Sequence, residues 1–271
     1  MTAQELRGGV VRGVERIGRL SVAAVEGLGH YGWLIGESLF WIVVGPRYRQ
    51  TVRIDSVFAH MMEIGIRAIP IITMMAGTIG VMLAIQGIHT LRLFGAESRV
   101  VIGIALSVTR EFAPLITGIL VAGRTGAALA ARLGTMRINQ EIDALHVMAI
   151  NPVRFLVAPA LIAMLVMVPI LTFYSDLVGL YAAGLYVNLD LGMSMAAYFD
   201  QTVEILTIDH IMHGISKSAI FAVLITIVGV ANGFAVTGGA EGVGKATTRA
   251  VVQSISAIVV TDMIFVFAVT R

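Results

Sequence analysis

One short segment of the sequence has the residue types and spacing of a phosphate-binding loop. Residues 239–245 read GAEGVGK and match the first seven positions of the GxxxxGK[S/T] pattern. The eighth position must offer a hydroxyl group to magnesium, but Ala246 stands there, and the loop would have to follow a β-strand. The preceding residues are instead a long apolar run. We therefore interpret these glycines as a tight turn, and any ATP that this protein uses is expected to be bound by another chain.

A second segment has residues that could hold a metal ion. His210 and His213 are spaced three apart, so a helix would place them on one face beside Asp209. No further ligand cluster accompanies them, and the chain has no cysteine. No Ser/His/Asp signature or Gly-x-Ser-x-Gly elbow is present either. We expect no metal site, no catalytic residues and no enzymatic activity in this chain.

Charged residues inside apolar runs are the most informative candidates. Arg110, Glu111, Asp176 and Asp262 lie within such runs, and Lys217 lies at the end of one. A charge at bilayer depth costs at least about 2.5–3.5 kcal/mol, so it normally faces a partner or a water-filled cavity. Two interpretations stay open. The charges form an interhelical ion-pair lock that fixes packing, or they form a polar zone in a substrate path.

The composition places these residues in a membrane protein. Of the 271 residues, 57% are hydrophobic and 13% are charged, and the mean hydropathy is +0.88. Soluble domains are about 45–50% apolar and about 25% charged. The net charge of +2 is too small to suggest nucleic acid as a partner. These values exclude a soluble, disordered or nucleic-acid-binding protein and predict an all-α integral membrane protein.

Five spans are predicted from runs long enough to cross the bilayer, which takes about 20 apolar residues. They cover about 64–91, 100–123, 155–187, 214–238 and 250–270. The chain is thus divided into an N-terminal segment, 1–60, and a five-span domain, 61–271. In the N-terminal segment, basic residues alternate with apolar ones, and both tryptophans are present, which is typical of an amphipathic helix in the membrane interface. The alternative, a sixth span over 31–44, is too short and contains Glu37.

The distribution of Lys and Arg predicts the orientation. Fourteen lie before residue 68 and in the second and fourth connections, against four on the other side. The N-terminus is therefore expected in the cytoplasm and the C-terminus outside. Within the cytoplasmic connection 124–154, residues 139–150 have the pattern of a short amphipathic helix, with acidic residues in the first turn and Asn151-Pro152 after it. Such a helix is suited to docking into a groove of a soluble partner.

Two blocks of the sequence resemble one family. Residues 110–155, REFAPLITGILVAGRTGAALAARLGTMRINQEIDALHVMAINPVRF, and residues 245–254, KATTRAVVQS, are similar to the MlaE (YrbE) family of ABC-transporter permeases, as is Asp262 in the last span. The resemblance covers the chain from about residue 10. It implies a homodimeric permease in the bacterial inner membrane, bound to two cytoplasmic ABC ATPase subunits that hold ATP and magnesium. A small accessory protein on the ATPase and a periplasmic hexamer of MCE-domain subunits complete the implied assembly.

The resemblance also implies a substrate and residue roles. The substrate is phospholipid, moved between the inner membrane and the periplasmic MCE-domain partner to maintain the lipid asymmetry of the outer membrane. Residues 139–150 become the coupling helix. Its contacts with the ATPase are expected from Glu141, Ile142, Asp143, Leu145 and Met148. Substrate-binding residues are expected to be Arg110, Glu111, Gln86, Ile88, Lys217 and Asp262, with an apolar wall over 71–88.

Two other functions fit the sequence less well. An ion-coupled secondary transporter would use Glu111 and Asp262 as a proton relay, but such folds usually contain internal repeats, and none is evident. A non-transporting membrane scaffold would instead need none of the intramembrane charges for lipid traffic.

Overall fold

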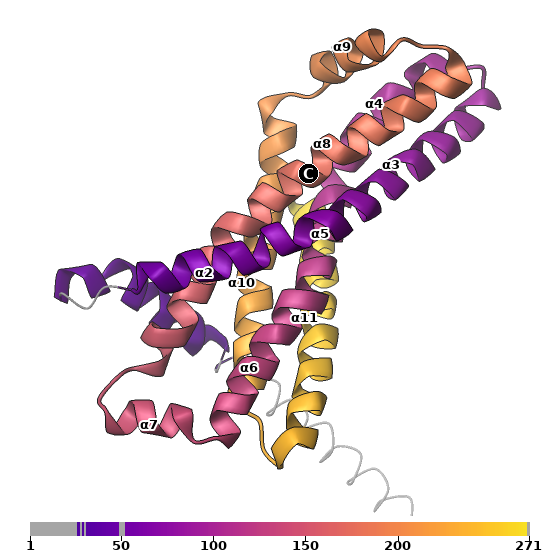
Figure 1. Ribbon diagram of the computed structural model, residues 1–271. Helices are drawn as coiled ribbons and strands as arrows, with labels where there is room; N and C mark the ends of the chain where they lie inside the picture. The colour runs from indigo at the N-terminus through magenta and orange to yellow at the C-terminus, as the bar shows by residue number, and fades with distance from the viewer. Residues whose placement is uncertain (1–25, 28, 30, 49–51, 270–271) are drawn as a thin grey trace, which may run out of the picture.

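The computed structural model describes residues 26–27, 29, 31–48 and 52–269, and all regular elements in these ranges are helices (Figure 1). Five helical stretches are long and apolar enough to cross a membrane. They are Ile54–Arg92, Glu97–Ile138, Val153–Leu191, Ile208–Phe234 and Gly239–Val269. The all-α membrane class and the number of spans predicted from the sequence are confirmed.

The first span is longer than predicted. Helix α2 (Ile54–Ile64) runs through a short 3-10 turn, η2 (Ile66–Ala68), into α3 (Ile69–Arg92), and Pro70 occupies the first turn of α3, where its missing N–H costs nothing (Figure 1). The 24 residues of α3 rise about 36 Å, which already exceeds the hydrocarbon thickness of about 30 Å. Helices α2 and α3 together are therefore longer than one crossing requires.

The second span differs most from the sequence prediction. A 3-10 turn, η3 (Glu97–Arg99), leads into α4 (Val100–Ser107), the π-helical turn η4 (Val108–Phe112), α5 (Ala113–Val121), a second π-helical turn η5 (Ala122–Gly126) and α6 (Ala127–Ile138). The helical structure continues to Ile138, past residue 123 where the span is predicted to end. Small residues after it let the helix continue while packed against its neighbours: a Cβ at Gly229 of α10 would touch the Gly126 carbonyl. The connection to the third span is consequently short.

Two short helices mark the two ends of the bundle. Helix α7 (Glu141–Val147) follows α6 at one end, and α9 (Met195–Ile205) lies at the opposite end (Figure 1). Between them run η6 (Val153–Val157) with α8 (Ala158–Leu191), and α10 (Ile208–Phe234) with α11 (Gly239–Val269). Below, these ends are called the α7 end and the α9 end.

The loop that resembles a phosphate-binding motif is helical. Gly238 and Gly239 have φ of 84° and 75° and turn the chain between α10 and α11, a conformation that glycine adopts without strain. The rest of the segment forms the first turns of α11, so the predicted tight turn is confined to these two glycines. Because a helix precedes it instead of a strand, the segment lacks the context of a nucleotide-binding loop.

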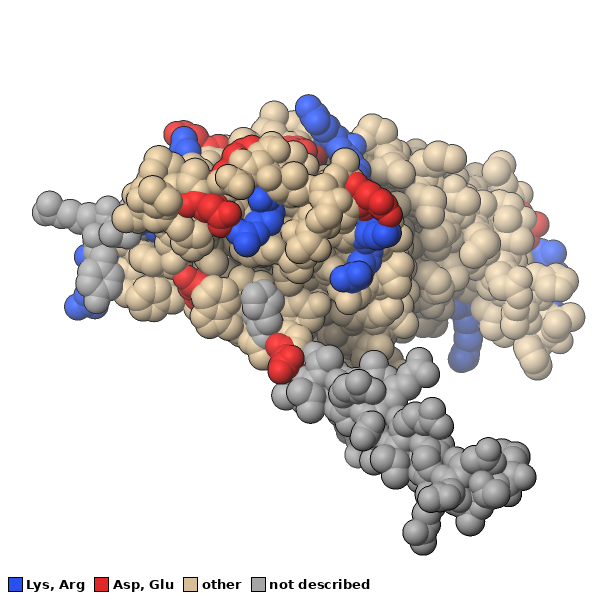
Figure 2. Space-filling view, turned by 90° about the horizontal axis from the view of Figure 1, so that it is seen from below, with Lys and Arg blue, Asp and Glu red and all other residues tan. Residues whose placement is uncertain are grey.

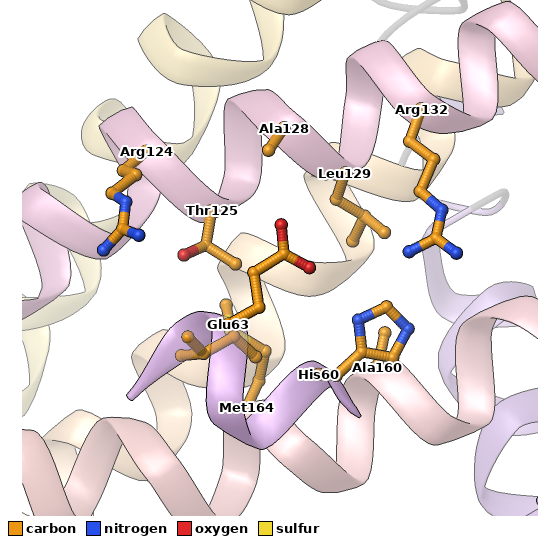
Figure 3. A pocket seen from close by; sticks show the side chains of 10 residues that line it. His60, Glu63, Arg124, Thr125, Ala128, Leu129, Arg132, Ala160 and Met164 are labelled. Atoms are coloured by element: carbon orange, nitrogen blue, oxygen red, sulfur yellow. The ribbon is translucent and has the colours of Figure 1, made fainter. Parts of the chain in front are cut away.

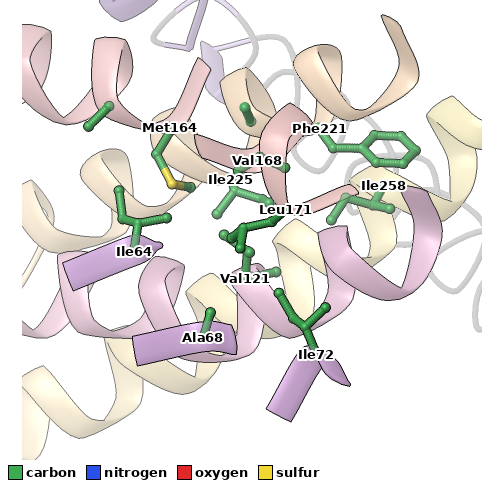
Figure 4. Packing of buried hydrophobic residues seen from close by; sticks show 13 residues of the cluster. Ile64, Ala68, Ile72, Val121, Met164, Val168, Leu171, Phe221, Ile225 and Ile258 are labelled. Carbon is green, nitrogen blue, oxygen red and sulfur yellow. The ribbon is translucent and has the colours of Figure 1, made fainter. Parts of the chain in front are cut away.

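The central core joins all five spans. Ile64, Ala68 and Ile72 of the first span meet Val121 of α5, Met164 and Leu171 of α8, Phe221 and Ile225 of α10 and Ile258 of α11 (Figure 4). Near the α7 end, Leu34 of the N-terminal helix (31–43) is buried against Leu129 and Val157. That helix is not among the five candidate spans. It carries both tryptophans of the predicted interfacial segment, and residues 1–25 of that segment lie outside the described residues.

Helix α3 packs closely on α8 at Gly80, which gives a stability prediction. A methyl group at Gly80 would overlap the carbonyl group of Gly179, whereas one at Gly77 would make only ordinary contacts of 3.8 Å with α8 side chains. We expect Gly80→Ala to lower the free energy of unfolding by about 1–3 kcal/mol. Gly77→Ala, the matched control, should be neutral or stabilising by up to about 1 kcal/mol. Thermal unfolding in detergent measures both, and equal melting temperatures for the two variants would contradict the packing described above.

Candidate functional site

A buried ion cluster joins three spans near the middle of the bundle. The Lys217 side chain is fully buried, and its Nζ lies 2.6 Å from Glu111 Oε2, 2.7 Å from Asp262 Oδ1 and 3.1 Å from the Arg110 carbonyl oxygen. The ammonium group donates hydrogen bonds to Glu111 and to the Arg110 carbonyl, whereas Asp262 Oδ1 lies at ion-pair distance without a hydrogen bond. We call Glu111, Lys217, Asp262 and the adjacent His213 the Lys217 cluster.

The π-helical turn η4 supplies two of these oxygens for a structural reason. Single π turns within α-helices change the direction of the side chains around them and are frequent at functional sites. Pro114 follows in the first turn of α5 and has no N–H, so it cannot donate to the Arg110 carbonyl four residues earlier. Lys217 donates to that oxygen instead. The lysine thus completes a break in the backbone hydrogen bonding as well as pairing with the carboxylates.

A glycine brings Lys217 close to η4. A Cβ at Gly214, one turn before Lys217 on α10, would collide with the carbonyl oxygen of Thr109. The absence of a side chain at this position lets the two backbones approach closely enough for Lys217 to reach Glu111. Lys217 was predicted to lie at the end of a span. Helix α10 begins earlier, at Ile208, so the lysine lies well inside it.

His213 is the member of the cluster that the sequence prediction placed elsewhere. Its Nε2 lies 4.0 Å from Glu111 Oε1, and its ring meets the Phe265 ring edge-on with centroids 4.9 Å apart. The side chain is only 7% exposed. Within the described residues no group of three or more His, Cys, Asp or Glu side chains could hold a metal ion. The informative spacing was His213 to Lys217, four residues apart on one face of α10, rather than His210 to His213.

The cluster is open on one side. Lys217 is fully buried and the Asp262 side chain is 15% exposed, but the Glu111 side chain is 36% exposed. The two carboxylates outnumber the ammonium group, and Arg110 lies near enough to His213 to act on it electrostatically. Glu111 is therefore the partner of Lys217 that another anion can replace with least rearrangement.

Helix α7 turns only part of its surface outward. Ile142 and Leu145 are buried, whereas Val147 is 88% exposed and Met148 60% exposed. Asp143 forms an ion pair with Arg137 of α6. Seen from the α7 end, charged side chains of both signs gather on this part of the molecule (Figure 2).

The segment after α7 is anchored to the N-terminal helix. Asn151 accepts hydrogen bonds from the N–H groups of Val153 and Arg154 and donates one to Glu37 at 2.7 Å. Because its side chain serves both η6 and helix 31–43, it ties the start of the third span to the N-terminal helix.

The profile of the family described as "Permease MlaE" matches residues 57–268. The chain belongs to the MlaE permease family. A probable ABC transporter permease protein of Rickettsia conorii is 31% identical over 257 residues, which are 92% of this chain and 96% of that protein. A probable ABC transporter permease protein of Synechocystis is 37% identical over 231 residues, 85% and 86% of the two chains. The intermembrane phospholipid transport system permease protein MlaE of Haemophilus influenzae is 29% identical over 258 residues, 94% and 96% of the two chains.

In this MlaE-family permease the remaining predicted site residues lie apart from the cluster. Gln86 is exposed on α3, and Ile88 is 2% exposed within a core cluster with Val100 and Val187. Asp176 is buried in α8, and its Oδ1 has no hydrogen-bond partner among the described residues. The structure thus brings together Glu111, Lys217 and Asp262, while Arg110 contributes its backbone carbonyl.

The helix at the predicted coupling segment is shorter than expected and has less exposed surface. It was expected over 139–150, with Ile142 and Leu145 contacting the ATPase, but α7 covers only Glu141–Val147 and buries both side chains within the chain. An isolated amphipathic pattern does not reveal whether its apolar face packs on the same chain or on a partner. The surface left for a partner comprises Glu141, Asp143, His146, Val147 and Met148.

Proposed function

We propose that this ABC-transporter permease moves phospholipid between the bacterial inner membrane and a periplasmic MCE-domain partner, and so maintains the lipid asymmetry of the outer membrane. ATP would be hydrolysed in two separate cytoplasmic ABC subunits, accompanied by a small accessory protein. The relative from H. influenzae, whose name specifies intermembrane phospholipid transport, supports this substrate. The observation that carries the proposal is the Lys217 cluster, a buried charge set with one exposed carboxylate inside an apolar bundle.

The Lys217 cluster would provide a binding site for the phospholipid headgroup. A phosphate group offers the same oxygen acceptors as a carboxylate, so it can replace Glu111 at Lys217 Nζ by a charge-assisted hydrogen bond. Releasing Glu111 would loosen the contact between η4 and α10, because Lys217 joins these elements. Headgroup binding would thereby be coupled to helix movement in the bundle.

A homodimer would form across the first and last spans. In their most apolar stretches only 28% and 17% of residues are buried within the chain, against 56–67% for the other three spans. These two helices therefore have the most free surface for a second copy. Helix α11 also carries Asp262, so a dimer contact along it would place the cluster near the interface between subunits.

The proposed orientation puts α7 in the cytoplasm, where it would contact an ATPase. The N-terminus would then be cytoplasmic and the C-terminus periplasmic, as the distribution of Lys and Arg predicts. The α9 end would face the periplasmic MCE-domain hexamer.

Purification of the native complex in mild detergent, followed by mass spectrometry of co-eluting chains and lipids, tests the proposed assembly. We expect two copies of this chain, two ABC ATPase subunits, an MCE-domain protein and bound phospholipid. Recovery of the chain without any ATPase subunit, or with no phospholipid, would contradict the proposal.

A further inference from the structure

A pocket between α2 and α6 lies outside the Lys217 cluster and shares no residue with it. It encloses about 70 Å³, and its apolar floor includes Met164 of α8. Arg124, Thr125 and Arg132 line it from η5 and α6, and His60 and Glu63 face them from α2 (Figure 3). An apolar recess with charged groups of both signs is the environment that a small zwitterionic group requires.

Arg124 is the residue that points to a ligand. Its Nη1 atom is buried and has no hydrogen-bond partner among the described residues. In the same part of the chain, neither Glu63 nor Arg132 forms an ion pair. A buried N–H donor on a charged group is costly when it has no acceptor. A bound anion would supply the acceptor that the chain itself lacks.

The depth of the pocket suits a lipid headgroup. If α3 crosses the hydrocarbon layer, as its length allows, then α2 and the pocket beside it lie at the level of the headgroups at the α7 end. A recess of about 20 Å³ shares Arg124 and Thr125 with this pocket, and Ala68, Ile71 and Leu120 also line it. It is too small for an acyl chain, so the chains of a lipid seated in the pocket would lie outside it, along exposed apolar side chains such as Met62 and Ile66.

We propose that this pocket binds an aminophospholipid with an ethanolamine headgroup from the leaflet at the α7 end. The phosphate accepts hydrogen bonds from Arg124 and the Thr125 hydroxyl, and the ammonium group pairs with Glu63. The acyl chains lie outside the pocket, along the exposed apolar side chains of Met62 and Ile66. Arg132, eight residues along α6 and exposed, adds positive charge at the open rim.

The inference rests on the proposed function only in taking phospholipid as the ligand. A failure to bind lipid here, with ATP-driven lipid transport intact, would overturn this site and leave the function standing. A loss of ATP-driven lipid transport with lipid binding at this site intact would overturn the proposed function and leave this site standing.

Native mass spectrometry of the full chain in detergent tests the site with dioleoyl phosphatidylethanolamine, phosphatidylglycerol and phosphatidylcholine as probes. We expect phosphatidylethanolamine to bind most tightly. Arg124→Gln should weaken all three about tenfold, the effect of losing one hydrogen bond to a charged group. Glu63→Gln should weaken only phosphatidylethanolamine and strengthen phosphatidylglycerol, because it removes a carboxylate that repels the anionic lipid. Glu63 is exposed, so this variant tests the site even if Arg124→Gln fails to fold.

Arg137→Gln is the matched control, since Arg137 lies on the same helix but outside the pocket and pairs with Asp143. It should bind all three lipids as the parent chain does. Soluble phosphoethanolamine and inorganic phosphate should not compete with the lipid at equal concentration, because they lack the acyl chain. Competition by either compound would assign the pocket to a soluble anion instead. Unchanged lipid binding in both Glu63→Gln and Arg124→Gln would overturn the proposal.

Discussion

Replacing Lys217 with methionine is expected to lower the free energy of unfolding by about 3–5 kcal/mol, because it breaks a buried ion cluster by removing its cation. The change leaves Glu111 and Asp262 without the ammonium group that lies 2.6–2.7 Å from each, inside an apolar bundle. It also removes the donor to the Arg110 carbonyl, which Pro114 cannot replace. Unfolding in detergent, followed by heat or denaturant, measures the effect.

Lys245→Met is the surface control for this experiment. Lys245 pairs with Glu241 at 2.6 Å, but both side chains are more than 70% exposed. Exposed ion pairs contribute little, so a change below about 0.5 kcal/mol is expected. If Lys217→Met were as stable as Lys245→Met, the buried cluster would not be formed as described.

A triple variant, Glu111→Gln with Lys217→Met and Asp262→Asn, separates the structural role of the cluster from its transport role. Neutral side chains replace the whole set, and such replacement of a buried ion cluster is often neutral or stabilising. We expect stability to recover most of the loss seen in Lys217→Met. Lipid transport should remain absent, because no cation is left to receive the phosphate. Recovery of both stability and transport would show that the cluster serves only to pack the helices and has no role in transport.

Replacing Val147 with arginine is expected to weaken association with the ATPase subunit by at least about 2 kcal/mol, roughly a 30-fold increase in Kd. Val147 is 88% exposed and has no packing role within the chain, so the variant should fold normally. Glu141→Lys should act in the same direction. Co-purification of the ATPase with tagged permease, titrated by salt, measures the effect.

Phe94→Arg is the matched control for Val147→Arg. Phe94 is 77% exposed and follows α3, at the α9 end of the bundle. It tests whether an exposed apolar residue matters for ATPase binding at any position. ATPase association should be unchanged in Phe94→Arg, and undiminished association in Val147→Arg would remove α7 from the coupling interface.

Hydropathy predicted the spans well where they face lipid and less well where they end. The five runs are explicit in the sequence because hydrocarbon tolerates few charges over about 20 residues. Hydropathy did not predict where the helix that contains the second span ends. Its helix continues past Arg124 because Gly126 and its small neighbours pack against α10, and that contact depends on the tertiary structure.

The sequence predicted the charged residues of the Lys217 cluster but not which of them contact one another. Glu111, Lys217 and Asp262 stood out because charges are rare in apolar runs. Which of them pair depends on helix rotation, and here the π turn η4 determines it. The backbone role of Arg110 follows from the same turn, which no sequence pattern indicated. Gln86 and Ile88 were also predicted to bind substrate, and the structure places neither at the cluster.

The most direct test of the central claim reconstitutes this chain in liposomes, with and without its ABC ATPase subunits, and measures phospholipid transfer to an acceptor. Transfer should require both the ATPase subunits and ATP hydrolysis, and it should be lost in the triple variant. The chain alone should neither hydrolyse ATP nor move lipid under a pH gradient. Lipid transfer by the isolated permease, driven by that gradient through Glu111 and Asp262, would contradict the account.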